Sequence, residues 1–156
     1  MKLPLLLLFL ISTFNGYSQE SESTDEKLIT QTVNRFFESL EKKDTALLKS
    51  ATMPQGQVWR IYNDDRSEPA DMRFFKDDIA TLSTLPQVKE TATSFEIKIN
   101  KDIAMAWVPY GFWVKEQFSH CGIDVFTLFR IDGEWKIMSA AYSVEKENCG
   151  ELMGEE

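Results

Sequence analysis

Hydrophobic residues recur at helical spacing early in the chain. They share one face of a helix, whereas most charged residues fall outside it: Leu28, Ile29, Val33, Phe36, Phe37 and Leu40. Ser23 and Glu26 stand in front of this run at the spacing of a capping box. The pattern predicts an amphipathic helix ending near Lys43. A second helix is expected over Thr45–Ser50, with Asp44 as its N-cap. Met53-Pro54 would end this helix.

Most of the later segments alternate between apolar and polar residues, as strands do. We expect short strands at Gly56–Tyr62 and Thr93–Ile99, with a third helix between them from about Ala70 to Leu82. Three long strands then follow as a meander over 103–115, 118–131 and 134–144. Asp132-Gly133 is a strong signal for a two-residue hairpin, and Glu116-Gln117 is a weaker one. Three helices and a mostly antiparallel sheet predict an α+β fold.

The middle strand carries unusual polar residues. Two-residue loops would place His120, Gly122 and Asp124 on one face together with Trp107 and Trp113. The opposite face would be almost wholly apolar, and it would carry Tyr110, Phe112, Val114, Cys121, Ala140 and Tyr142. Three helices can cover only one face of such a sheet. Covering the polar and aromatic face would enclose a pocket, and the apolar face would then be buried in a homodimer.

The first residues have the features of a signal peptide. Lys2 precedes the apolar run Leu3–Phe14, which is too short to span a membrane, and small residues follow at Gly16 and Ser18. We therefore expect a signal peptide at 1–18, a polar lead-in at 19–24, one domain at 25–149 and an acidic tail at 150–156. An exported protein, periplasmic or secreted, is the predicted outcome.

Charge and cysteine content narrow the classes of partner. The chain has 25 acidic and 17 basic residues and a net charge of −8, which disfavours nucleic acid and anionic membrane surfaces as partners. Cys121 and Cys149 suggest one disulfide in an oxidising compartment, with two free thiols as the alternative. One histidine and two cysteines do not make a zinc site. Neither a phosphate loop nor a dinucleotide fingerprint is present, so no metal or cofactor is implied.

The order of elements resembles that of the nuclear transport factor 2-like superfamily. Local motifs resemble exported bacterial proteins of the group called putative lumazine-binding: Trp107-Val-Pro-Tyr110-Gly-Phe112, Phe118-Ser-His-Cys-Gly-Ile-Asp124, Gly133-Glu-Trp-Lys-Ile137 and Glu147-Asn-Cys149. The resemblance implies a cone-shaped fold, related to SnoaL-like cyclases, whose open end holds a small and often apolar ligand. It also implies dimerisation through the sheet, but no particular reaction.

Two sets of residues are candidates for a site in the cone. His120 and Asp124 are the candidate catalytic pair, because superfamily enzymes use an aspartate or histidine there as general acid or base. The alternative is that both satisfy neighbouring polar groups. The candidate ligand-binding rings are Trp59, Tyr62, Trp107, Tyr110 and Trp113. A non-catalytic binder of a small organic or aromatic molecule is the preferred reading, ahead of an isomerase, dehydratase or cyclase and ahead of a protein-interaction module.

Overall fold

The computed structural model describes residues 23–63 and 70–154. The expected signal peptide, most of the lead-in, the loop around Asp64 and the last two residues of the acidic tail lie outside these ranges. The helical elements are α1 (Thr24–Lys42), α2 (Thr45–Ala51), α3 (Phe75–Thr81), the 3₁₀ turn η1 (Leu82–Thr84) and α4 (Cys149–Met153). The strands are β1 (Thr52–Tyr62), β2 (Asp71–Phe74), β3 (Val88–Ala92), β4 (Glu96–Asn100), β5 (Ile103–Val114), β6 (Gln117–Ile131) and β7 (Glu134–Val144).

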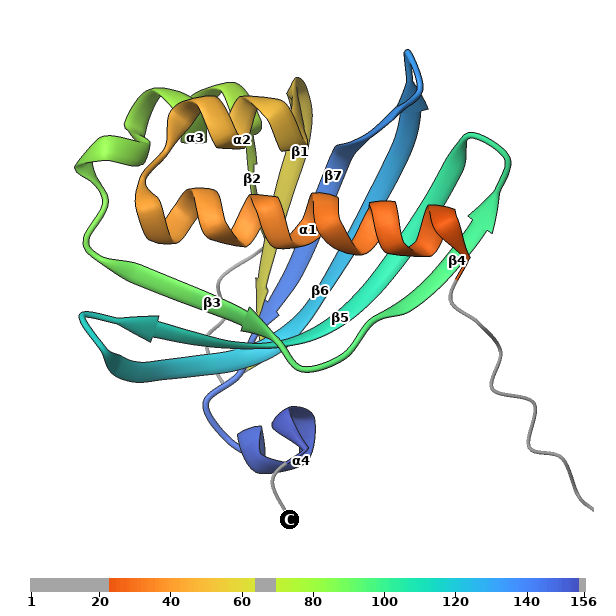
Figure 1. Ribbon diagram of the computed structural model, residues 1–156. Helices are drawn as coiled ribbons and strands as arrows, with labels where there is room; N and C mark the ends of the chain where they lie inside the picture. Colours follow the sequence, from red (N-terminus) through yellow and green to blue (C-terminus); the bar gives the residue numbers. More distant parts are fainter. Residues whose placement is uncertain (1–22, 64–69, 155–156) are drawn as a thin grey trace, which may run out of the picture.

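The fold is a strongly curved sheet with helices on its concave side (Figure 1). The strand order is β2-β1-β7-β6-β5-β3, and β4 pairs with another part of β5. Every pairing among these strands is antiparallel except that of β1 with β7. The α+β class and the meander of the last three strands are therefore confirmed.

The first helix forms as its sequence predicts. The Ser23 side chain accepts a hydrogen bond from the Glu26 N–H at 3.2 Å, and the Glu26 carboxylate accepts one from the Ser23 N–H at 2.6 Å. The apolar face of α1 packs against the sheet, where the Phe36 and Phe37 rings lie 5.6 and 5.9 Å from the ring of Phe126. Burying rings of this size supplies a large part of the core's hydrophobic stabilisation.

The prediction of a third helix is wrong for the first half of that segment. Asp71–Phe74 forms β2, which pairs with β1, and only Phe75–Thr81 is helical. The Asp77 carboxylate accepts a hydrogen bond from the Phe74 N–H, which places the helix start after Phe74. Strand β3 was not predicted at all, and β4 begins three residues later than the expected strand at Thr93.

Two β-bulges change which residues share a face of the sheet. The Asp132-Gly133 turn is confirmed, with φ of 52° and 83°. The other turn is Lys115-Glu116, one residue earlier than expected, and this shift alone leaves the faces unchanged. However, Trp113 pairs with Phe118 whereas Phe112 pairs with His120, so Ser119 is an extra residue in β6. Met138 is likewise an extra residue in β7. Beyond each bulge, the side chains of the strand point to the opposite face from the one predicted.

The face assignment from sequence is therefore wrong for much of β5 and β7. Tyr110 and Phe112 share the concave face with His120 and Asp124, because they pair across β5 and β6 in the shifted register. Ala140 and Tyr142 join the same face opposite Phe126 and Asp124. Trp107 pairs with Val125 on the convex face, where its side chain is 44% exposed.

A disulfide fixes the C-terminus to the convex face. Cys121 of β6 and Cys149 at the start of α4 are joined, with 5.6 Å between their Cα atoms, which confirms the bonded alternative. The short helix α4, which the sequence pattern did not predict, lies on the side of the sheet opposite to α1 (Figure 1). A Cβ at Gly111 would lie 2.8 Å from Met153 Sδ, so the small residue gives α4 room to approach β5.

Candidate functional site

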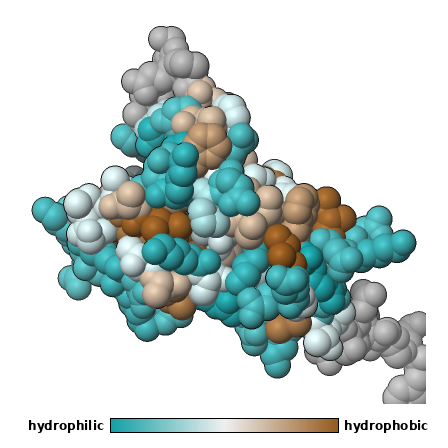
Figure 2. Space-filling view, turned by 90° about the horizontal axis from the view of Figure 1, so that it is seen from above, coloured by the Kyte–Doolittle hydropathy of each residue, from teal (hydrophilic) through white to brown (hydrophobic). Residues whose placement is uncertain are grey.

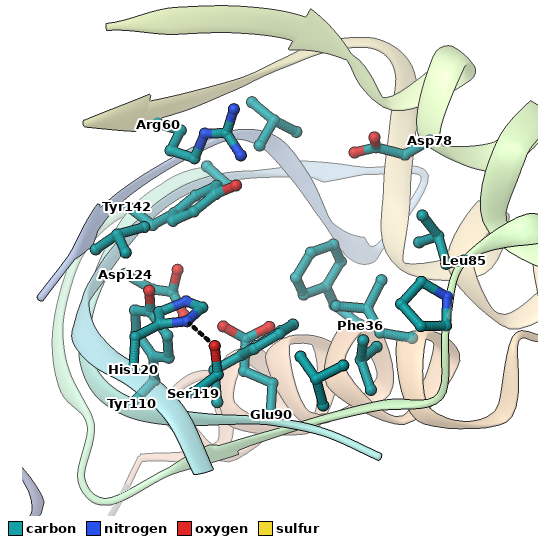
Figure 3. Close-up of a pocket in the computed structure, with 18 of the residues that line it drawn as sticks. Phe36, Arg60, Asp78, Leu85, Glu90, Tyr110, Ser119, His120, Asp124 and Tyr142 are labelled. Carbon is teal, nitrogen blue, oxygen red and sulfur yellow. Dashed lines mark hydrogen bonds between the residues drawn. The ribbon is translucent and has the colours of Figure 1, made fainter. Parts of the chain in front are cut away.

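A cavity of about 460 Å³ lies between the concave sheet and the helices (Figure 3). This volume is within the range of small-molecule sites. One wall is apolar and comes from α1 and the segment around η1, through Phe36, Leu40, Leu82, Leu85 and Pro86. The other wall is the sheet, which contributes polar and aromatic side chains from six strands: Arg60, Tyr62, Arg73, Glu90, Tyr110, Phe112, His120, Asp124 and Tyr142.

Asp124 is the most deeply buried acid of the cavity. It is 3% exposed, and its Oδ2 has no hydrogen-bond donor among the described residues. The carboxyl group of Glu90 on β3 lies beside it, within reach of a hydrogen bond. Carboxylate oxygens only accept hydrogen bonds, so this contact requires a proton on one of the two acids. Glu90 and Asp124 therefore form a pair that holds a proton.

The electrostatics of this pair agree with its geometry. Burial raises the pKa of Glu90 to about 8, against the pull of the Asp124 hydrogen bond and the positive charge of Arg73. Burial also raises the pKa of Asp124 well above its usual value, and the neighbouring Glu90 charge raises it further. Two adjacent acids in a site of low polarity cannot both ionise at neutral pH. The pair titrates as a unit.

Tyr110 lies beside the acid pair, but its hydroxyl is already committed. It donates a hydrogen bond to the Ser143 carbonyl oxygen at 2.6 Å. The ring fits because its cross-strand partner is Gly122: a Cβ there would lie 2.9 Å from the ring and 2.1 Å from the Ser143 oxygen. Burial raises the pKa of Tyr110, and the charge of Asp124 raises it further. Tyr110 is therefore a neutral wall of the cavity.

His120 is at the edge of the cavity and is held by its neighbours. Its ring stacks on Phe112 at 4.7 Å between centroids, and its Nδ1 lies 3.0 Å from Ser119 Oγ. Burial lowers its pKa, and the positive charges of Lys146 and Arg60 lower it further, so the ring is neutral near pH 7. His120 and Asp124 share the concave face, as expected from their spacing.

Two arginines lie on the side of the cavity formed by β1 and β2. Arg60 forms an ion pair with Asp71, and its guanidinium lies 4.9 Å from the centroid of the Tyr62 ring. Arg73 Nε donates to Asp78 Oδ1 at 2.5 Å, and Arg73 Nη1 lies 3.5 Å from the Tyr142 hydroxyl oxygen. Burial raises the pKa of Asp78, and Arg73 opposes this shift. These cations are thus paired with acids rather than left for an anion.

The structure brings together only some of the residues predicted from sequence. His120, Asp124, Tyr62 and Tyr110 line the cavity. Trp59 and Trp107 do not: both are over 40% exposed and lie on the convex face. Trp113 is also outside, with its ring 5.5 Å from that of Phe118.

Six polar lining residues were missed: Arg60, Arg73, Asp78, Glu90, Ser119 and Lys146. Glu90 was missed because Val88-Lys-Glu-Thr-Ala92 shows no apolar alternation. The only sequence signal for Glu90 is an acidic residue shortly before a predicted strand. Such residues are too common to indicate a site. Tyr142 was placed on the wrong face because the bulge at Met138 leaves no mark in the sequence pattern.

No group of three or more possible metal ligands occurs within 23–63 and 70–154. No helix in those same ranges is long and apolar enough to cross a membrane.

Solved structures with this arrangement come from several bacteria. A protein of unknown function with a cystatin-like fold from Nostoc punctiforme aligns with a TM-score of 0.63 and 14% identity, over 80% of this chain and 95% of that one. A nuclear transport factor 2-like superfamily protein from Salmonella enterica aligns with a TM-score of 0.62 and 17% identity, over 78% and 92%. A protein of unknown function from Mycobacterium tuberculosis aligns with a TM-score of 0.63 and 9% identity, over 84% of this chain and 91% of that one.

At these identities the structural neighbours establish the fold alone. A search of curated proteins gives no significant match. The family model described as putative lumazine-binding matches residues 24–143, which is most of the chain and includes every strand that lines the cavity. The protein belongs to this family, and its fold is that of solved nuclear transport factor 2-like proteins.

Proposed function

We propose that this protein binds a small, largely apolar ring compound in the cavity of its cone, without chemical conversion. The observation that carries the proposal is the cavity itself: about 460 Å³, with an apolar wall from α1 and η1 and a few polar groups converging from the sheet. Sites for small organic molecules have this composition. The family's description names lumazine, a flat two-ring compound, and so supports a small ring compound as the ligand.

Thermal unfolding of the purified protein against a metabolite library that includes lumazine tests the proposal. A ligand that binds only the folded state raises the melting temperature, and the shift grows with the logarithm of the ligand concentration once the site is saturated. Ser119 is an exposed residue of the cavity lining, so Ser119→Trp is expected to obstruct the cavity and abolish the shift. Ser94→Trp, at an exposed position outside the lining, is the matched control. A shift that survives in Ser119→Trp would place the ligand elsewhere and contradict the proposal.

A second candidate function is proton transfer to or from a bound substrate. It is favoured by Glu90, whose pKa of about 8 suits a general acid or base near neutral pH, and by its contact with Asp124. This candidate replaces the pairing of Asp124 with His120 by a pairing with Glu90. Turnover of a library hit that is lost in both Glu90→Gln and Asp124→Asn would establish it. Binding without turnover would exclude it for that compound.

We also propose that the protein is exported. The apolar run after Lys2 and the disulfide between Cys121 and Cys149 support this, because disulfides persist in oxidising compartments. Expression of the full chain in a bacterium, followed by fractionation and N-terminal sequencing, is expected to give a product beginning near Gln19 outside the cytoplasm. A product retained in the cytoplasm with residues 1–18 intact would contradict this.

A further inference from the structure

One hydroxyl group in the polar wall of the cavity has no acceptor for its proton. Tyr142 lies on the concave face of β7, and its hydroxyl end is directed into the space between the sheet and the apolar wall (Figure 3). The hydroxyl oxygen accepts a hydrogen bond from Arg73 Nη1 at 3.5 Å. A guanidinium group only donates, so the proton of the hydroxyl must point elsewhere. In the part of the chain that the structure describes, the Tyr142 hydroxyl makes no other hydrogen bond.

The neighbouring charges hold this hydroxyl in a donating orientation. Arg73 is itself fixed, because its Nε donates to Asp78 and its guanidinium lies 5.9 Å from the centroid of the Tyr142 ring. A hydroxyl whose oxygen faces a cation turns its proton away from that cation. Burial raises the pKa of Tyr142, and the charges of Arg73 and Arg60 only oppose this shift, so the hydroxyl keeps its proton at neutral pH. The proton is therefore left for a group inside the cavity.

Another tyrosine of the same wall does not offer a donor in this way. Tyr110 donates its proton to the Ser143 carbonyl oxygen at 2.6 Å, so its hydroxyl is already paired. Water can satisfy the Tyr142 hydroxyl, but a ring compound that displaces the water must supply an acceptor of its own. A compound without an acceptor would leave the O–H unpaired, which costs more than the hydrogen bond itself contributes.

We propose that Tyr142 is a specificity-determining residue of the cavity, whose hydroxyl donates to a hydrogen-bond acceptor on the edge of the ligand ring, such as a ring carbonyl oxygen. This proposal rests on the function proposed above and adds the chemical class of the ligand. Selectivity against rings without an acceptor follows from the unpaired hydroxyl that they would leave. The contact with Arg73 strengthens the donor, because hydrogen bonds in a chain polarise one another.

Two ring compounds of nearly equal size test the proposal. 1-Tetralone carries a carbonyl oxygen on its edge, and tetralin has the same two rings without that oxygen. Their dissociation constants would be measured at pH 7 by ligand-observed NMR, for wild type and for Tyr142→Phe, which keeps the ring and removes the hydroxyl. We expect Tyr142→Phe to weaken the binding of 1-tetralone at least about fivefold and to bind tetralin equally or more tightly. An equal effect on both compounds, or no effect on 1-tetralone, would overturn the proposal.

A matched variant and a second measurement locate the effect at the Tyr142 hydroxyl. Tyr110→Phe removes a hydroxyl whose proton is already paired with Ser143, so it is expected to change the affinities for the two compounds by the same factor. A selective loss of 1-tetralone binding in Tyr110→Phe as large as that in Tyr142→Phe would overturn the assignment. The infrared carbonyl band of 1-tetralone bound to wild type is expected at a lower frequency than in an apolar solvent. An unshifted band would overturn the proposal even if Tyr142→Phe does not fold.

The outcomes separate this proposal from the one on which it rests. Ring compounds that bind in the cavity without regard to the carbonyl oxygen would overturn the role of Tyr142 and leave small-molecule binding intact. Failure of 1-tetralone to bind, while compounds of the metabolite library raise the melting temperature, would do the same. If neither compound binds and the library gives no shift, both proposals fail.

Discussion

The pairing of Glu90 with Asp124 is the residue-scale feature that distinguishes this cavity from an ordinary apolar pocket. The two acids come from strands far apart in the sequence, and β5 lies between them in the sheet. Their contact requires a proton that each acid would release in water at neutral pH. Burial thus converts two ordinary carboxylates into one group that titrates in the physiological range.

The stability of the protein is expected to fall as pH rises from about 5 to 8. The pKa of Glu90 is raised on folding from 4.5 to about 8, so between these values the folded state binds a proton that the unfolded state has released. The unfolding free energy then decreases with pH, at most by about 1.4 kcal/mol per pH unit. The full contribution is present below pH 4.5.

Urea unfolding at pH 5, 6, 7 and 8 checks this, with wild type compared with Glu90→Gln. The difference between the two isolates the acid pair from His120, whose lowered pKa acts in the opposite direction. Glu96→Gln, at an exposed position of β4, is the control and is expected to follow wild type. Parallel curves for wild type and Glu90→Gln would show that the pair does not hold a proton.

At the scale of elements, the turns between the long strands show how local sequence determines structure. Asp132-Gly133 has the residues that a turn with positive φ requires, and it was found where expected. Lys115 and Glu116 have the same backbone conformation without either preferred residue. Side chains in this conformation cost roughly 1–2 kcal/mol each. The second turn is therefore imposed by the strands that it joins.

Glu116→Gly is expected to raise the unfolding free energy by about 0.5–1 kcal/mol. The φ of 66° at Glu116 is strained for a residue with a Cβ, and glycine relieves it at some cost in chain entropy. Gly133→Ala is the reverse experiment: φ is 83° and no atom lies within 4 Å of the new Cβ, so only backbone strain is added. Opposite signs of the two changes in chemical denaturation are expected, and equal signs would contradict the interpretation.

The sequence was sufficient for elements that carry their own local signals. The capping box of Ser23 and Glu26, the apolar stripe of α1 and the strand Glu134–Val144 were all identified. The bulges at Ser119 and Met138 were not, because each depends on how two strands fit together rather than on the residues of one. Glu90 was missed for a related reason: β3 acquires its strand structure by pairing with β5.

The disulfide is an element-scale restraint on α4. The double variant Cys121→Ser with Cys149→Ser is expected to lose about 3.5 kcal/mol of unfolding free energy, because the bond closes a loop with a sequence separation of 28. Urea denaturation of the oxidised protein and of the variant measures this. Wild type under a reducing agent should match the variant. A loss below about 1 kcal/mol would show that packing of α4 on β5 suffices without the bond.

At the scale of the whole molecule, the convex face remains uncovered over much of its area. Seven large apolar residues of the strands there are at least 37% exposed: Trp59, Ile61, Met72, Ile103, Trp107, Phe118 and Phe129. The helix side instead presents small apolar patches among hydrophilic side chains (Figure 2). We therefore still expect a homodimer through the sheet, although through a different set of residues from the one expected from sequence.

Light scattering at micromolar concentration is expected to give twice the monomer mass. Trp107→Lys, alone or with Trp59→Lys, is expected to give a monomer, because both side chains project from the exposed convex face. Leu28→Lys is the matched control, since Leu28 is 41% exposed on the helix side. Wild type with the mass of a monomer would refute the dimer, and a dimer that survives both tryptophan changes would refute this interface.

The parallel pairing of β1 with β7 has a consequence for the order of folding. β1 ends at Tyr62, whereas β7 begins at Glu134, so more than half of the domain must be synthesised before β1 can pair with β7 and join the long strands. Until then, β1 has only β2, α2 and α3 as neighbours, and α1 lacks the part of β6 on which Phe36 and Phe37 pack. Long-range pairings of this kind slow folding. A chain that stays unfolded until its C-terminal end appears remains in a form that a secretion channel can thread.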